Sequence, residues 1–362
     1  MKKVAIIGTV GIPASYGGFE TLVENIVGDN QSKNISYTVY CSSNAYTEKK
    51  DYYKGARLKY IPLNANGPQS ILYDIISLIQ ASYDCDEILV LGVSGCCFLP
   101  IFRLFSKKRL IINIDGLEHR RGKWGKWTKK FLRLSEQSAI KYGDVIIVDN
   151  KGIEDYVNEN YGRPSKLIAY GGDHVLRNIS ADTSNMILRK YHLESNKYAF
   201  SVCRIEPENN VHLILEAFST ITLPIVFVGN WNKSEYGKSL FEKYSKLKNI
   251  ILLSPIYDLD ELFVMRSNCF VYMHGHSAGG TNPSLVEAMF FGKPIIAFDC
   301  VYNRYTTDGK AIFFSTSNDI TKSINDLKDD NIAANCYGKT MSEIATQKYL
   351  WKIIADKYEQ LY

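Results

Sequence analysis

The chain has 362 residues, of which 46% are hydrophobic and 22% charged, and its net charge is +5. This length predicts two domains, each large enough for its own core, and the composition is that of an ordinary globular protein. The longest apolar runs, such as 88–93, are too short to span a bilayer. Residues 1–18 are too rich in glycine for a signal peptide. The eight cysteines form no C-x-x-C pair, so we expect buried thiols in a reducing compartment.

Positive charge is concentrated in one segment. Residues 98–141 hold twelve lysines and arginines against three acidic residues, and tryptophan, phenylalanine and leucine lie between them. This mixture is typical of a surface that contacts anionic lipids. Nucleic acid is the rival partner, but the bulky aliphatic residues and the lack of a nucleic-acid-binding motif argue against it. A solvated helix face with buried aromatic residues is the simplest alternative.

Strand-like and helix-like segments alternate along the chain. The first half predicts strands at 4–8, 37–41, 58–61, 88–91, 110–113, 145–148 and 166–168, with helices at 18–27, 68–82, 124–141 and 153–161. After a glycine-rich break at 170–173, further strands are predicted at 198–203, 225–228, 250–253, 269–272, 294–297 and 312–314. Such alternation predicts an α/β fold with parallel sheets. Two series predict two doubly wound domains, with ligands at the carboxyl ends of the strands in the cleft between them.

The break at 170–173 predicts domains at 1–172 and 173–346. Apolar positions from 349 to 362 recur with a helical period, which predicts an amphipathic closing helix. We expect this C-terminal helix, within 347–362, to pack back on the first domain.

The most informative segment is 269–294, which predicts a strand, a glycine-rich loop and a helix started by Pro283 and Ser284. Loop amides beyond a strand, next to a helix N-terminus, suit a phosphate. Glu287 would repel a phosphate but can accept hydrogen bonds from sugar hydroxyls. The segment therefore predicts a nucleotide site. The alternative is that Ser284 and Glu287 only form an S-x-x-E capping box.

Two candidates lie in the first half of the chain. Gly17 and Gly18 open the first predicted helix and would let the backbone approach a diphosphate, although the G-x-G-x-x-G fingerprint is absent and an ordinary loop is the alternative. Asp115 follows the strand at 110–113, where it could orient or deprotonate an acceptor hydroxyl. It could also simply start an Asx-turn. His119, among arginines, is more simply a surface histidine.

Arg204 follows the first strand of the second half and could clamp phosphate oxygens with two N–H groups. The alternative is a salt bridge to Glu206 or Glu208. Asn209 or Asn210 is expected to cap the next helix.

No metal site is predicted. Asp84 of one Asp-x-Asp string precedes a strand, and Asp258 of the other is expected to be a helix N-cap. No histidine–cysteine cluster is present in the sequence either.

These motifs resemble those of glycosyltransferase family four, whose GT-B architecture has two facing Rossmann-like domains. Gly17 and Gly18 match its paired glycines, Arg204 its phosphate-binding arginine, and Glu287 its ribose-binding glutamate, followed by G-x-P at 292–294. The strings YGGFETLVE, DGLEHRRGKW, RIEPENN and HGHSAGGTNPSLVEAM look more narrowly like the bacterial dTDP-rhamnose-dependent rhamnosyltransferase branch.

Two positions depart from the family pattern. The first glutamate of its E-x7-E signature falls at Gly279, and its usual lysine falls at Asn209. Loop amides, or Arg304, could offset the missing cation. The missing glutamate is consistent with a 6-deoxy sugar, which presents a methyl group in place of a hydroxyl.

The resemblance implies a retaining glycosyltransferase without a metal cofactor. It would move L-rhamnose from dTDP-L-rhamnose to a polyprenyl-diphosphate-linked saccharide in bacterial surface polysaccharide synthesis. The protein would be cytoplasmic and peripherally associated with the inner face of the cell membrane through 98–141. A UDP-hexose donor, a non-hydrolysing nucleotide-sugar epimerase and a binding scaffold that has lost catalysis are the alternatives.

The resemblance also implies roles for individual residues. The implied catalytic residues are Asp115, Arg204 and Glu287. The implied donor contacts are Gly17, Gly18, Arg204, Asn209, Gly279, Gly280, Thr281, Asn282 and Glu287. The implied acceptor or membrane side is Glu118, His119, Arg120, Arg121, Trp124 and Trp127.

Overall fold

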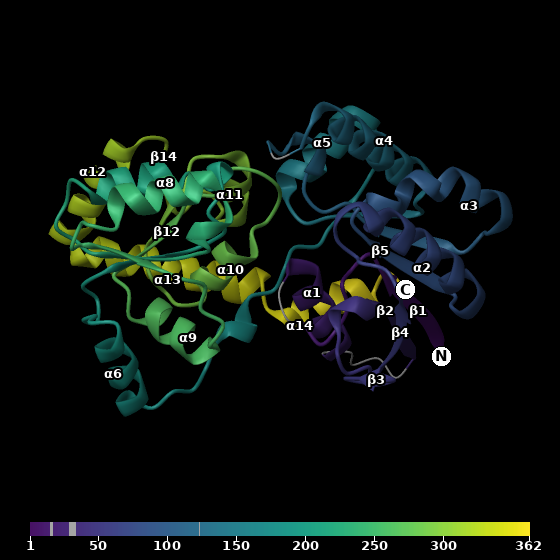
Figure 1. Ribbon diagram of the computed structural model, residues 1–362, viewed down its shortest axis with the longest axis horizontal. Helices are drawn as coiled ribbons and strands as arrows, with labels where there is room; N and C mark the ends of the chain where they lie inside the picture. The colour runs from purple at the N-terminus through teal and green to yellow at the C-terminus, as the bar shows by residue number, and fades with distance from the viewer. Residues whose placement is uncertain (15–16, 29–33, 123) are drawn as a thin grey trace. The chain divides into compact units, whose positions relative to one another are not determined.

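A computed structural model describes residues 1–14, 17–28, 34–122 and 124–362. Tyr16 and Lys123, which belong to two of the strings quoted above, lie outside these ranges. The chain forms two compact units (Figure 1): Met1–Tyr170 with Trp351–Tyr362 make unit 1, and Gly171–Leu350 make unit 2. Each unit has a sheet of largely parallel strands between helices. The predicted α/β class with two domains is therefore confirmed.

The sheet of unit 1 has the strand order β3-β4-β2-β1-β5-β6-β7-β8. The strands are β1 Lys2–Ile7, β2 Ile35–Ser42, β3 Tyr52–Tyr53, β4 Ala56–Ile61, β5 Glu87–Leu91, β6 Arg109–Asn113, β7 Val145–Val148 and β8 Lys166–Leu167. Among the described residues, only β3 pairs antiparallel, through a turn at Lys54 and Gly55. This two-residue edge strand was not predicted, because it is too short to show an alternating pattern.

Helices cover the sheet of unit 1. They are α1 Gly18–Gly28, α2 Ser70–Asp84, α3 Leu99–Phe105, α4 Lys126–Tyr142, α5 Lys151–Tyr161 and α14 Trp351–Glu359. Helices α1 and α14 lie side by side (Figure 1), and Trp351, Ile354 and Tyr358 join the core with residues of β1 and α1. Tyr358 also accepts a hydrogen bond from Asn113 Nδ2 at 2.9 Å. The last helix is thus an integral part of unit 1.

The sheet of unit 2 has the order β11-β10-β9-β12-β13-β14. Its strands are β9 Ala199–Val202, β10 Ile225–Val228, β11 Ile250–Leu253, β12 Val271–His274, β13 Ile295–Phe298 and β14 Ile312–Phe314. Its helices are α6 Ala181–Lys190, α7 Val211–Phe218, α8 Glu235–Tyr244, α9 Leu259–Ser267, α10 Pro283–Met289, α11 Val301–Thr306, α12 Ser317–Asp329 and α13 Asn331–Lys348. The strand order reverses between β9 and β12, so the loops that follow these strands flank a topological switch point.

The cysteines are all free thiols, but Cys336 is exposed, so the expectation of burial is wrong for that residue. Its position on α13 faces solvent because the other side of the helix, at Ala334, Met341 and Ala345, packs inward. Within the described ranges, no helix is long and apolar enough to cross a bilayer.

Candidate active site

Two loops of unit 2 meet at the switch point, one after β9 and one after β12. Glu208 O accepts hydrogen bonds from both the backbone N–H of Ser277, at 2.9 Å, and its hydroxyl, at 2.8 Å. Asn210 Nδ2 donates to Gly275 O at 2.9 Å. The structure therefore holds the loop that carries Arg204 against the loop that carries Gly279 to Asn282, at the carboxyl edge of the sheet.

Arg204 keeps much of its side chain accessible, with an exposed fraction of 37%. The nearest carboxylate oxygen, of Glu206, lies 4.0 Å from Nη1, which is beyond hydrogen-bonding distance. The alternative of a salt bridge to Glu206 is thus present as a long ion pair, without a hydrogen bond. The guanidinium can still donate two parallel hydrogen bonds to an anion.

Asn209 is buried, and its amide is used within the protein. Its Nδ2 donates to Arg204 O at 2.6 Å, and its Oδ1 lies 2.6 Å from His276 Nδ1. The prediction that Asn209 or Asn210 caps α7 is wrong: Asn210 occupies the N-cap position but makes no side-chain cap. Its amide bonds to Gly275 O because the neighbouring loop offers a buried carbonyl.

Glu287 lies on the face of α10 opposite the apolar side chains that enter the core, which are Leu285, Val286, Ala288 and Met289. Its Oε2 accepts a hydrogen bond of 2.6 Å from Nη2 of Arg266, and its Oε1 lies 3.6 Å from Nε2 of His174. Burial lowers the pKa of His174, against the opposing effect of Glu287, so this imidazole is neutral near pH 7. The carboxylate of Glu287 is thus held in one orientation mainly by Arg266.

The capping-box alternative for α10 is wrong. Asn282 is the N-cap, and its Oδ1 accepts from the Ser284 N–H at 3.0 Å and from the Ser284 hydroxyl at 2.7 Å. Because the helix start is satisfied by Asn282, Glu287 is not needed as a capping residue. Gly279 and Thr281 are buried, and Gly279 has a φ of +93°, a conformation that disfavours any residue with a side chain.

Arg266, His174 and His276 were not predicted. The sequence gives only a weak indication of Arg266, which is a cation between Met265 and Cys269 where an apolar residue is expected. In the structure its side chain is 7% exposed. His276 lies within the segment 269–294, but its sequence position does not indicate its contact with Asn209, and nothing in the sequence indicates that His174 approaches this site. Arg304, considered as a substitute cation, is held by Asp299 through two hydrogen bonds of 2.6 and 2.8 Å.

In unit 1, the loop after β1 leads to Gly17 and Gly18 at the start of α1. Gly17 has a φ of +135°, and a Cβ there would lie 1.8 Å from Glu20 Oε2. Glu20 is buried and accepts from the Val10 N–H at 2.8 Å and from the Thr9 hydroxyl at 2.9 Å. This role of Glu20 was not predicted, although a glutamate in the first turn of a helix is a capping signal. The loop conformation therefore requires glycine at 17 whether or not a ligand binds.

Asp115 follows β6 and is half-buried, with a φ of +58°. Burial raises the pKa of Asp115, and Glu118 adds to this, while Arg121 and a hydrogen bond from Tyr170 oppose it. The alternative that Asp115 starts an Asx-turn is wrong. The turn is started by Asn113, whose Oδ1 accepts a hydrogen bond from the Asp115 N–H at 3.0 Å. A carboxylate with a raised pKa at the end of a strand can act as a proton acceptor.

The implied acceptor-side residues form local networks. Glu118 accepts from Arg121 at 2.9 Å and from Trp124 Nε1 at 3.2 Å. His119 Nδ1 lies 3.0 Å from the buried Glu136, so it is not the surface histidine of the simpler interpretation. The Arg120 guanidinium lies over the Tyr156 ring, and Trp127 is exposed.

Two family models match the chain. Residues 186–343 match the model described as "Glycosyl transferases group 1". Residues 1–173 match a domain of unknown function, DUF1972. No curated protein matches the chain in sequence. The glycosyltransferase match lies within unit 2 and includes Arg204, Arg266 and Glu287.

Solved structures resemble the whole chain. Sucrose-phosphate synthase from Thermosynechococcus elongatus has a TM-score of 0.82 at 15% identity, over 100% of this chain and 98% of its own. Anabaena Alr3699/HepE in complex with UDP-glucose has a TM-score of 0.77 at 14% identity, over 100% and 99%. S. aureus MnaA with UDP has a TM-score of 0.64 at 16% identity, over 99% and 95%. These similarities confirm the GT-B fold.

Proposed function

Because residues 186–343 form a glycosyltransferase group 1 domain, we propose that the protein is a retaining glycosyltransferase without a metal cofactor. It moves L-rhamnose from dTDP-L-rhamnose onto a lipid-linked saccharide in bacterial surface polysaccharide synthesis. One observation carries this proposal: Glu287 on α10, held by Arg266, lies in the same unit as the accessible Arg204. Arg204 follows β9, and α10 follows the neighbouring strand β12. The UDP and UDP-glucose named for the similar structures support a nucleotide-sugar donor.

The donor contacts follow from the chemistry of these groups. As the glycosidic bond breaks, negative charge builds on the diphosphate. Arg204 and the amides of Gly279, Gly280, Thr281 and Asn282 stabilise this charge, as do the amides at Gly17 and Gly18. Glu287 accepts hydrogen bonds from the ribose hydroxyls with the lone pairs that Arg266 leaves. Asn209 acts indirectly, because its amide holds the Arg204 carbonyl.

The acceptor side is assigned to unit 1. Asp115 takes the proton of the acceptor hydroxyl, and the raised pKa of this carboxyl favours proton transfer to it. Glu118, His119, Arg120, Arg121 and Trp124 shape the neighbouring surface. The acceptor is a polyprenyl-diphosphate-linked saccharide, so the protein works at the cytoplasmic face of an anionic membrane, which segment 98–141 contacts with Trp127 and its cations.

The rhamnose assignment is supported by Gly279. Where the family has a glutamate for the donor sugar, this chain has a buried glycine at φ +93°. That backbone conformation cannot readily accept a carboxylate side chain. A 6-deoxy sugar places a methyl group there and needs no such partner. A UDP-hexose is the second candidate donor, favoured by the UDP-glucose complex of a similar structure.

We predict that Glu287→Ala and Arg204→Ala each lower transfer by at least about 100-fold, since each removes a preorganised contact to the donor. Release of dTDP from dTDP-L-rhamnose in the presence of acceptor measures the activity. Glu343→Ala, at an exposed site on α13, is the matched control, and circular dichroism checks folding. Transfer at the level of the unmodified protein in either variant would refute the assignment. A new isomer of the donor in the absence of acceptor would instead identify an epimerase.

A further inference from the structure

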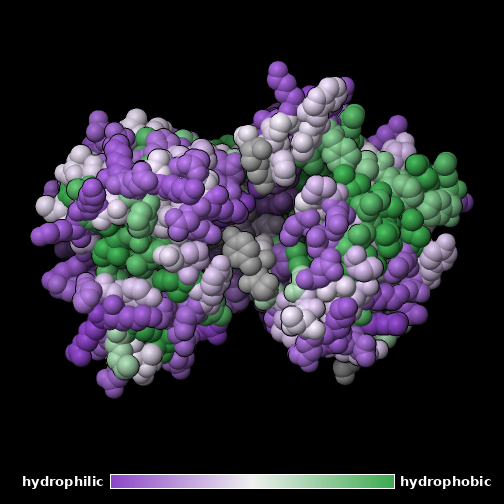
Figure 2. All heavy atoms as spheres, in the orientation of Figure 1, coloured by the Kyte–Doolittle hydropathy of each residue, from purple (hydrophilic) through white to green (hydrophobic). Residues whose placement is uncertain are grey.

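Exposed apolar side chains of unit 1 concentrate on three helices. Helix α2 exposes Leu72, Ile76 and Tyr83, α3 exposes Ile101, Leu104 and Phe105, and α4 exposes Trp127 and Leu134. Figure 2 shows a continuous hydrophobic area over the position of α2 and α3 in Figure 1. We call these eight residues the apolar patch. Monomeric soluble proteins rarely leave so many large side chains together in water.

The outer faces of α2 and α3 carry almost no charge. Asp74 of α2 is buried and accepts the Gly95 N–H, and Asp84 at its end pairs with Lys59. The charged residue of α3, Arg103, folds back so that its Nε and Nη2 donate to Tyr142 O. A helix that is apolar on its outer as well as its inner face is expected to be covered by something else.

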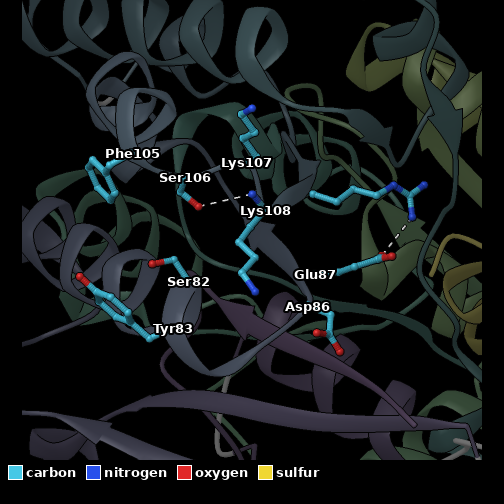
Figure 3. Close-up of a pocket in the computed structure, with 9 residues that line it drawn as sticks. Ser82, Tyr83, Asp86, Glu87, Phe105, Ser106, Lys107 and Lys108 are labelled. Carbon is cyan, nitrogen blue, oxygen red and sulfur yellow. Dashed lines mark hydrogen bonds and ion pairs between the residues drawn. The ribbon is translucent and has the colours of Figure 1, made fainter.

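Two hollows with basic linings lie at the C-terminal end of α3. The larger, of about 730 Å³, is lined by residues of α2, α3 and the starts of β5 and β6, and the smaller, of about 460 Å³, by residues near the ends of α3 and α4. Ser106 and Lys107 line both. Figure 3 shows the rings of Tyr83 and Phe105 along one side of the larger hollow and the Lys108 side chain across its middle. The apolar patch therefore continues into the hollows.

The carboxylates of these hollows are already engaged. Asp86 accepts the Lys3 N–H at 2.9 Å, Glu87 pairs with Lys2 and Arg109, and Asp144 pairs with Arg103. By contrast, Lys107, Lys108 and Lys141 have no acidic partner within the described ranges. The surplus charge at this end of the patch is positive and complements anionic groups.

We propose that the apolar patch and the two hollows form a docking surface for an anionic phospholipid bilayer. The side chains on α2 and α3 enter the boundary between headgroups and acyl chains, and lysines 107, 108 and 141 bind headgroup phosphates. Trp127 and Tyr83 lie at headgroup depth, where amphipathic rings are favoured. This inference rests on the membrane part of the proposed function. The proposed membrane contact includes residues of α2, which lie outside segment 98–141. It does not include the residues around Asp115.

Co-sedimentation with vesicles tests this surface. The full-length protein should bind vesicles of phosphatidylglycerol and phosphatidylcholine at about 0.1 M salt, bind pure phosphatidylcholine weakly, and dissociate at about 1 M salt. The double variant Leu104→Glu/Phe105→Glu should lower vesicle affinity by at least about tenfold, since charges replace inserted side chains. Lys107→Glu/Lys108→Glu should lower it comparably on anionic vesicles.

Matched controls lie on unit 2: Ile332→Glu replaces a side chain that is 84% exposed on α13, and Lys328→Glu lies at the end of α12. Both should bind vesicles like the unmodified protein. Equal vesicle binding by all variants would overturn the proposal. The proposal would also be overturned if inorganic phosphate alone displaced the protein from vesicles and Leu104→Glu/Phe105→Glu had no effect on vesicle binding. A dimer in sedimentation velocity that this variant dissociates would overturn it as well. Stabilisation by dTDP-L-rhamnose should survive in every variant, so failure of the docking surface and failure of the proposed enzyme activity are distinguishable.

Discussion

Glu287 owes its orientation to a residue from another helix. Arg266 on α9 is 7% exposed and donates to Glu287 at 2.6 Å, and its Nε has no hydrogen-bond partner among the residues that the structure describes. Burying an arginine that pairs with a single carboxylate costs solvation free energy. The pair is therefore not expected to add much to the stability of the folded protein. In the proposed donor site, the contact would keep Glu287 from turning away from the ribose. We therefore propose that Arg266 is a positioning residue.

We predict that Arg266→Met raises the KM for the nucleotide sugar by about tenfold while lowering kcat less, because a misplaced carboxylate binds the ribose poorly. The variant should also lose about 3 kcal/mol of unfolding free energy, since Glu287 loses its partner. Arg266→Lys should restore part of the KM, and Arg189→Met, on exposed helix α6, is the control. A loss of stability with an unchanged KM would show that Arg266 is structural only.

Asp115 leads to a prediction of pH dependence. Its pKa is raised, mainly by burial, and a general base loses activity when it is protonated. We therefore predict that the acid limb of the kcat/KM profile has its midpoint above the pKa of an ordinary aspartate, about 4. Asp115→Asn should abolish transfer, whereas Asp182→Asn, in the exposed first turn of α6, should leave the profile unchanged. An acid limb that persists in an active Asp115→Asn variant would assign the proton acceptor to another group.

At the scale of elements, helix α13 packs closely against the turn before β13. A Cβ on Gly338 would lie 2.1 Å from Gly292 O, an atom of the backbone that cannot swing away. Glycine at 292, with a φ of +61°, makes the turn itself. The turn conformation thus explains glycine at 292, and the close packing explains glycine at 338.

We predict that Gly338→Ala destabilises the protein by at least about 1 kcal/mol through overpacking. Helix propensity alone would predict the opposite, a gain of about 1 kcal/mol. Urea unfolding measures the difference, and Lys339→Ala, exposed on the same helix, is the control. A stabilised Gly338→Ala variant would show that α13 and the turn do not approach this closely.

The alternation of apolar segments was sufficient to predict most elements. Strands β10, β11 and β14 begin and end where the sequence predicts, because each is a short apolar run between turns. The same alternation predicts that Asp115, Arg204 and Glu287 follow β6, β9 and β12. Contacts between elements could not be predicted: Arg266 reaches Glu287 from α9, and Glu136 reaches His119 from α4. The capping role expected of Asn210 failed for the same reason, since Gly275 O competes for its amide.

At the scale of the whole molecule, the chain crosses between its units twice, near residues 170 and 350. The Gly172 N–H donates to Tyr349 O at 2.9 Å, so the two crossing segments are joined. A Cβ on Gly172 would lie 2.9 Å from side-chain atoms of Val286 on α10 and of Phe290, the residue that follows this helix. The first crossing segment thus packs directly on the helix that carries Glu287, which also explains why His174 lies near that carboxylate.

Thermal unfolding with a panel of nucleotide sugars tests most directly whether unit 2 binds an activated sugar through Arg204 and Glu287. A ligand that binds only the folded protein raises its Tm by mass action. We predict that dTDP-L-rhamnose raises the Tm more than UDP-glucose does, and that Arg204→Ala and Glu287→Ala abolish the shift. A larger shift with UDP-glucose would contradict the rhamnose assignment. No shift with any nucleotide sugar, or an equal shift in both variants, would contradict the donor site itself.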